Sequence, residues 1–183
     1  MFGKKSFICI VFLFFGAVFA EFPFENPAFE EKKQQLALVL GQGIRDHKDL
    51  RFERLYSVGI TYSQPYHFFR LPVRRNAEFI MHRGAGEFSR YNNWIAGLSQ
   101  DFFTPQLWRM YLSLGIGAYI KSEKTDRISS LFTFGQKGAL GFQVIDELRL
   151  EFFIRHFSNG TLTETSSGYD FIGLSAVWNF GTL

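Results

Sequence analysis

The chain has 183 residues, 46% of them hydrophobic and 19% aromatic, with a formal net charge of +3. Such a weak charge does not indicate binding to nucleic acid, so we expect no nucleic-acid partner. After residue 20 no segment approaches 18 consecutive apolar residues, which excludes transmembrane helices from that part of the chain. High aromatic content with a mean hydropathy of −0.02 is typical of a transmembrane β-barrel, whose wall alternates between apolar and polar residues.

Residues 1–20 have the features of a cleaved secretory signal peptide. Lys4 and Lys5 supply the positive start, a short apolar run follows at 7–15, and Ala20 is a small residue suited to the cleavage site. An uncleaved membrane anchor is the alternative, but the run is short of the roughly 20 residues that a spanning helix needs. We therefore expect an exported protein.

The mature domain is expected to be 21–183, which has the length of a single domain. Removal of the signal peptide takes away Cys9, the only cysteine, and two lysines. The mature chain can then form no internal disulfide, which is unusual for a small soluble secreted domain but not for a membrane barrel. Its net charge drops from +3 to +1.

Stretches in which apolar and polar residues alternate predict the strands, since successive side chains of a strand point to opposite faces. In the clearest, 110–120, the even positions are apolar and the odd positions are small or polar. The pattern predicts an all-β fold, an eight-stranded antiparallel transmembrane β-barrel. The third strand is the least regular, because Arg75 interrupts its apolar face. The expected strands are 35–43, 54–63, 72–82, 91–101, 108–120, 130–144, 147–158 and 169–180.

The connections suggest how the barrel is oriented. In bacterial barrels short periplasmic turns alternate with longer extracellular loops. With both termini in the periplasm, the short turn at Ile145-Asp146 would be periplasmic. Such barrels commonly finish on an aromatic residue, whereas this chain continues past Phe180 to Leu183. The expected extracellular loops are 44–53, 83–90, 121–129 and 159–168.

The last predicted hairpin places polar residues on the lipid-facing side of the wall. In strand 147–158 the even positions are apolar, and the same parity continues into His156 and Ser158. Asp170 lies on the apolar face of the next strand. A hairpin centred near residue 163 would pair Asp170 directly with His156, with Cβ atoms about 4.5–5.5 Å apart. In the order Asp170, His156, Ser158, an acid orients a base that activates a hydroxyl.

Two interpretations of these three residues remain open on the pattern alone. Polar and ionisable groups that face lipid are costly, and by default they mark function. Alternatively, strand 147–158 has already left the membrane at His156, and all three residues are ordinary rim positions.

The segment Arg155-His156-Phe157-Ser158-Asn159-Gly160 resembles the Arg-His-aromatic-Ser-Asn signature of the lipid A 3-O-deacylase (PagL) family. Residues 114–118 and 129–141 are also similar, so the resemblance covers residues 108–180. It implies an eight-stranded outer-membrane barrel with a triad of His, Ser and an acid on its outer wall. On this resemblance His156 is the catalytic histidine and Ser158 the nucleophile. Asp170 is the acid, at a position where the better-known members carry Glu.

Other polar residues are weaker candidates. Asn159 and the backbone amides of Asn159 and Gly160 follow the nucleophile and are candidates for holding the oxyanion, although an ordinary turn is the simpler interpretation of Gly160. His47, His67 and His82 lack metal-ligand spacing and are interpreted as loop or interface residues. We expect no metal and no cofactor. Arg and Lys side chains of the outer loops are candidates for contacting lipid A phosphates, with solvated loop charge as the favoured alternative.

With this resemblance we expect an outer-membrane serine hydrolase that removes an ester-linked acyl chain from lipid A, and the family's name implies the 3 position. Its expected partners are lipopolysaccharide as substrate and membrane lipid, and a homodimer is one option for its assembly. A non-enzymatic small barrel, such as an adhesin or structural protein, is one alternative and needs no Ser–His–acid geometry. A lipid acyltransferase is the other, and it differs in where the acyl group goes.

Overall fold

The computed structural model describes residues 33–45, 51–68, 71–160 and 167–182. The predicted signal peptide, 1–20, lies outside these residues, so its presence and cleavage stay predictions. In the described part of the chain, no helix is long and apolar enough to span a membrane.

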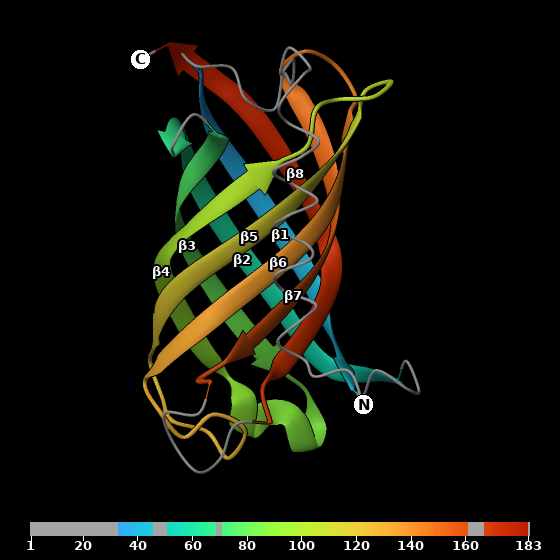
Figure 1. Ribbon diagram of the computed structural model, residues 1–183. Helices are drawn as coiled ribbons and strands as arrows, with labels where there is room; N and C mark the ends of the chain where they lie inside the picture. Colours follow the sequence, from blue (N-terminus) through green and yellow to red (C-terminus); the bar gives the residue numbers. More distant parts are fainter. Residues whose placement is uncertain (1–32, 46–50, 69–70, 161–166, 183) are drawn as a thin grey trace, which may run out of the picture.

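Eight antiparallel strands follow one another around a closed barrel, and the last returns to pair with the first (Figure 1). The predicted eight-stranded antiparallel β-barrel is confirmed. We call the end with the connections after the first, third, fifth and seventh strands the loop end, and the opposite end the turn end. The strands are β1 (Lys33–Arg45), β2 (Arg51–Phe68), β3 (Leu71–Gly84), β4 (Asn93–Phe103), β5 (Met110–Lys121), β6 (Phe132–Gln143), β7 (Leu148–Ser158) and β8 (Tyr169–Thr182).

The strand boundaries depart from the prediction mainly in β2. The sequence pattern ended this strand at residue 63, but β2 continues to Phe68, which pairs with Leu71 of β3. Pro65 removes one backbone donor, and the regular hairpin ladder continues past it. The expected loop 83–90 is partly the 3₁₀ helix η2 (Gly86–Tyr91).

Side chains alternate between the two faces of the wall as the pattern predicts. Odd positions of β5 and β7 point into the barrel. Even positions face outward and are apolar along β5 and along β7 up to Ile154. Arg75, which interrupts the apolar face of β3, is exposed, and its guanidinium lies 3.2 Å from the centroid of the Tyr66 ring. Five apolar residues on the outer face of β5 and β7 are 42–58% exposed: Leu112, Leu114, Ile116, Leu150 and Phe152.

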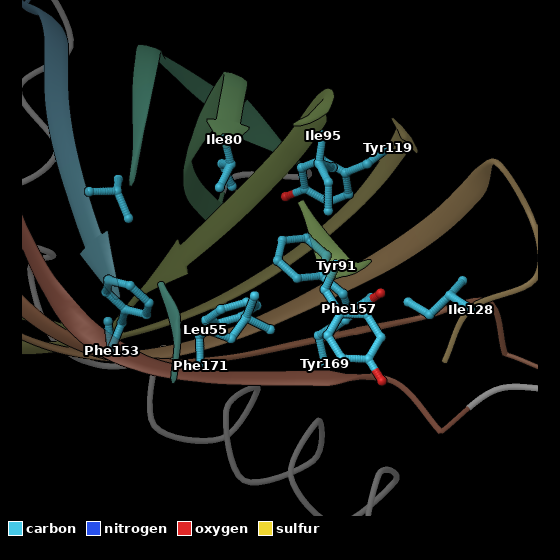
Figure 2. Packing of buried hydrophobic residues seen from close by; sticks show 12 residues of the cluster. Leu55, Ile80, Tyr91, Ile95, Tyr119, Ile128, Phe153, Phe157, Tyr169 and Phe171 are labelled. Carbon is cyan, nitrogen blue, oxygen red and sulfur yellow. The ribbon is translucent and has the colours of Figure 1, made fainter. Parts of the chain in front are cut away.

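The barrel interior is filled by side chains. Toward the turn end buried charges pair with one another: Arg74 binds Glu151 at 2.9 Å, and Lys137 binds Asp101 at 2.7 Å. A cavity beside these residues has a volume of about 10 Å³, room for about one water. Toward the loop end, aliphatic and aromatic side chains from several strands form an apolar cluster (Figure 2). The described interior is therefore a packed core that supports the wall from behind.

The orientation of the barrel in the membrane stays a prediction, with the loop end expected outside the cell. A cysteine in place of Arg51, beside the first loop, should react with a membrane-impermeant maleimide on intact cells. A cysteine in place of Asp146, in the turn between β6 and β7, should react only after lysis. Both side chains are exposed, and after loss of residues 1–20 the chain has no other cysteine. The reverse labelling pattern would show that the barrel lies in the membrane in the opposite orientation.

Candidate active site

The hairpin of β7 and β8 brings His156 and Asp170 together on the outer face of the barrel. The two residues are direct partners in the ladder, so the predicted hairpin centre near residue 163 is confirmed. His156 Nδ1 lies 2.7 Å from Asp170 Oδ1. The histidine side chain is 37% exposed and the aspartate 19%, so the pair is open to the outside of the wall. With Nδ1 engaged by the carboxylate, Nε2 is the nitrogen left for proton transfer.

Ser158 is the last residue of β7 and lies two positions beyond His156, on the same face. The rise of a strand separates their Cα atoms by about 6.5–7 Å. The Ser158 carbonyl accepts a hydrogen bond from Thr133 Oγ1 at 3.0 Å, which ties the end of β7 to β6. Among the contacts of the described residues, no hydrogen bond joins Ser158 Oγ to His156. Such bonds are often long in a free enzyme and tighten when substrate binds.

Aromatic side chains behind the wall hold the two strands that carry the site. Phe157, Tyr169 and Phe171 alternate with the outward residues, and all three are buried inside the barrel (Figure 2). The His82 ring packs among them, with centroid distances of 5.8, 5.8 and 4.6 Å. Burial of these large rings fixes the backbone of β7 and β8. The outward side chains of His156, Ser158 and Asp170 are therefore attached to a rigid stretch of backbone.

The loop between β5 and β6 fixes the start of β8. Arg127 in this loop binds both carboxylate oxygens of Glu53, at 2.7 and 2.6 Å. Burial alone would lower the pKa of Arg127, but the hydrogen bonds and charge of Glu53 raise it, so the guanidinium stays charged. The Tyr169 hydroxyl donates to Thr125 Oγ1 at 2.5 Å, and the Ser167 amide donates to the Arg127 carbonyl at 3.0 Å. This loop thus holds the residues just before Asp170.

Gly168 contacts the catalytic candidate histidine and was not singled out from the sequence. Its φ is +73°, and a Cβ added there would lie 2.7 Å from His156 Cε1 and 2.9 Å from the Phe157 carbonyl oxygen. Only a residue without a side chain fits this close approach. The signal was the hairpin register itself, since one more pair beyond Phe157 and Tyr169 places Gly168 opposite Ser158.

The remaining candidates lie in different surroundings. The Asn159 side chain is completely buried, so a role in holding an oxyanion would fall to its backbone amide. Gly160 is an exposed turn residue with a φ of +64°. The interpretation of His82 as a loop or interface residue was wrong, because it is fully buried within the apolar cluster. His67 is exposed on β2, and His47 lies outside the described residues. Within the described ranges no group of three or more His, Cys, Asp or Glu is arranged to hold a metal.

Comparison with known families identifies the chain. The family described as Lipid A 3-O-deacylase (PagL) matches residues 45–179, which span most of the barrel. The chain belongs to this family. A relative, the lipid A deacylase PagL of Bordetella bronchiseptica, is 35% identical over 75 residues. The aligned part covers 39% of this chain and 42% of the relative, so the match spans less than half of the relative's length.

Solved structures with the same fold include an outer-membrane enzyme and a surface protein. The crystal structure of the outer membrane enzyme PagL matches with a TM-score of 0.55 and 12% identity, covering 79% of this chain and 98% of that one. Neisserial surface protein A matches with a TM-score of 0.54 and 12% identity, covering 81% and 96%. At such identities the likeness shows the fold alone. With the match to the PagL family, it assigns this chain to the outer membrane.

Proposed function

We propose that this member of the PagL family is a serine hydrolase that removes an ester-linked acyl chain from lipid A. The observation that carries the proposal is the 2.7 Å contact between His156 Nδ1 and Asp170 Oδ1 on the outer wall, with Ser158 next on the same face. Ionisable groups are costly on a lipid-facing surface and mark function there. A substrate whose acyl chains lie alongside the wall accounts for their position.

The mechanism follows from the roles that this order allows. Ser158 Oγ attacks the ester carbonyl while His156 Nε2 takes its proton, and Asp170 stabilises the imidazolium that forms. The proton then passes to the leaving sugar hydroxyl, which leaves the acyl group on Ser158. Water, deprotonated by His156, releases the acyl group as a free acid and restores the serine. The backbone amides of Asn159 and Gly160 are the proposed donors to the oxyanion.

The 3 position of lipid A is proposed from the family name, since the family that matches is described as a 3-O-deacylase. The experiment uses the purified, folded full-length barrel with lipid A in detergent and ¹⁸O-labelled water. Mass spectrometry should show loss of one ester-linked chain, and the released acid should carry one ¹⁸O atom. Fragmentation of the product then gives the position that was cut. Intact lipid A after incubation with folded protein would contradict the proposal.

The same experiment separates the two alternatives. An acyltransferase would form the same acyl-serine but pass the chain to an added phospholipid, and little labelled acid would appear. A non-enzymatic barrel would leave all lipids unchanged. The His156–Asp170 contact favours an enzyme, because a structural barrel has no need of that pair on its outer face.

Gly168→Ala should lower the rate of deacylation by about 10- to 100-fold, because displacing a catalytic group by about 1 Å has an effect of that size on the rate. The added methyl must push against His156 Cε1, which lies 2.7 Å from the new atom. The kcat for lipid A is the measurement.

Gly86→Ala is the matched control for this variant. Gly86 lies in η2, away from the site, has a similar φ of +63°, and nothing lies within 4 Å of an added Cβ. The control therefore bears the same backbone strain without touching the histidine, and its kcat should stay near that of the wild type. Equal losses in both variants would mean that backbone strain, and not the contact with His156, explains the effect.

A further inference from the structure

The outer face of β5 to β8 carries a polar side chain that the proposed triad does not use. The even positions of these four strands face outward. Where the structure describes their side chains, they are apolar or glycine except at four positions. Three of these are His156, Ser158 and Asp170, and the fourth is Gln136, which is exposed on β6.

Gln136 is the direct partner of His156 in the ladder between β6 and β7. Gln136, His156 and Asp170 thus form one row across three strands, with the imidazole in the middle. Directly paired residues have Cβ atoms about 4.5–5.5 Å apart. The Cβ of Gln136 therefore lies beside that of His156, on the side away from the aspartate.

Away from His156, the outward neighbours of Gln136 are apolar. They are Phe134 on the same strand and Ile116, its partner on β5, and neither offers its amide a partner. Among the contacts of the described residues, the Gln136 side chain makes no hydrogen bond to the protein. A carboxamide that faces hydrocarbon without a partner is unfavourable. A bound polar group would remove that cost.

Gly138 is the next outward-facing residue of β6 after Gln136, toward the turn end, and it leaves a gap in the apolar wall. It lies between Leu114 of β5 and Ile154 of β7, both of which carry exposed side chains. A Cβ added to Gly138 would meet only Leu114 Cδ2, at 3.9 Å. A hydrocarbon chain can lie against the strand at this gap, with the carboxamide of Gln136 at its polar end.

We propose that Gln136 binds the acylated sugar of the substrate by donating a hydrogen bond to an oxygen beside the scissile ester. The acyl chain to be removed then lies over Gly138, and its ester carbonyl meets Ser158. This inference rests on the proposed function and adds a residue for substrate binding. Gln136 acts on affinity and takes no part in the proton transfers of the triad.

The test is Gln136→Leu, which removes the amide and keeps an outward side chain of similar size. For lipid A in detergent micelles, kcat/KM should fall about ten-fold, the effect expected for one lost hydrogen bond. The loss should appear in KM, with kcat within about two-fold of wild type. The thermal unfolding transition, followed by heat-modifiable gel mobility, should stay unchanged or rise, because leucine suits a lipid-facing position.

Gln100→Leu is the matched control. Gln100 lies on β4 and pairs with Ile116, on the other side of β5 from Gln136. Its substitution should leave kcat and KM unchanged. A wild-type kcat/KM in Gln136→Leu, or an equal loss in Gln100→Leu, would overturn the inference. So would a fall in kcat at constant KM, because it would mean that Gln136 acts on the chemical step through His156 and not on substrate binding. A wild-type protein that leaves lipid A intact would instead overturn the proposed function.

Discussion

Ser158→Ala and His156→Ala are each expected to abolish deacylation of lipid A, with losses of about 10⁴-fold or more in kcat. The nucleophile and its base act as one unit, so removing either one removes the whole pathway through the acyl-enzyme. Both side chains lie on the outer face of β7, outside the packed interior. The barrel should therefore fold normally in both variants. The measurement is the mass of lipid A after incubation with equal amounts of each purified protein.

Heat-modifiable gel mobility is the control for correct folding. Ser89→Ala is the control for the loss of a serine hydroxyl elsewhere on the protein. Ser89 is an exposed serine in η2, and its replacement should leave deacylation unchanged. Full activity in folded Ser158→Ala would show that Ser158 is not the nucleophile, and it would contradict the proposed serine mechanism.

Substitutions of Asp170 should produce graded losses. Asp170→Asn and Asp170→Ala are expected to lower kcat by about 10²–10⁴-fold, because the imidazole loses the carboxylate that fixes its tautomer and stabilises its charged form. Asp170→Glu should keep part of the activity, since the resemblance to the PagL family implies a glutamate at this position in other members. The measurement is kcat for lipid A across the three variants.

The alternative is that Asp170 has no catalytic role, and it predicts a different result. If Asp170 only begins a strand, all three variants should be fully active, because among the described residues its side chain hydrogen-bonds to His156 alone. Wild-type activity in folded Asp170→Ala would remove this residue from the site while leaving Ser158 and His156 in place.

The outward placement of the site was predictable from the sequence because a strand repeats every two residues. Even positions are apolar in β7 up to Ile154, and His156 and Ser158 continue that parity. The pairing with Asp170 followed from a hairpin centre, because register in a hairpin is set by its turn. Both inferences depend only on local geometry, and the structure has His156 opposite Asp170.

Contacts that close around the barrel were not predictable in this way. Arg127 and Glu53 are 74 residues apart, and nothing in the alternation of β2 relates Glu53 to a residue in the loop between β5 and β6. His82 was misjudged for the same reason, because its parity gives the inner face but not the aromatic rings that converge on it from β7 and β8. Gly168 needed the register to be extended by one further pair.

We propose above all that Ser158 is a nucleophile activated by His156 on the outer wall. The most direct test is to treat the folded barrel with a long-chain p-nitrophenyl alkylphosphonate, which reacts with an activated serine, and to map the adduct by peptide mass spectrometry. We expect one adduct, on Ser158, which forms in step with the loss of lipid A deacylation and is absent from the His156→Ala protein. An adduct on another residue that tracks the loss of activity, or complete deacylation by protein fully modified at Ser158, would contradict it.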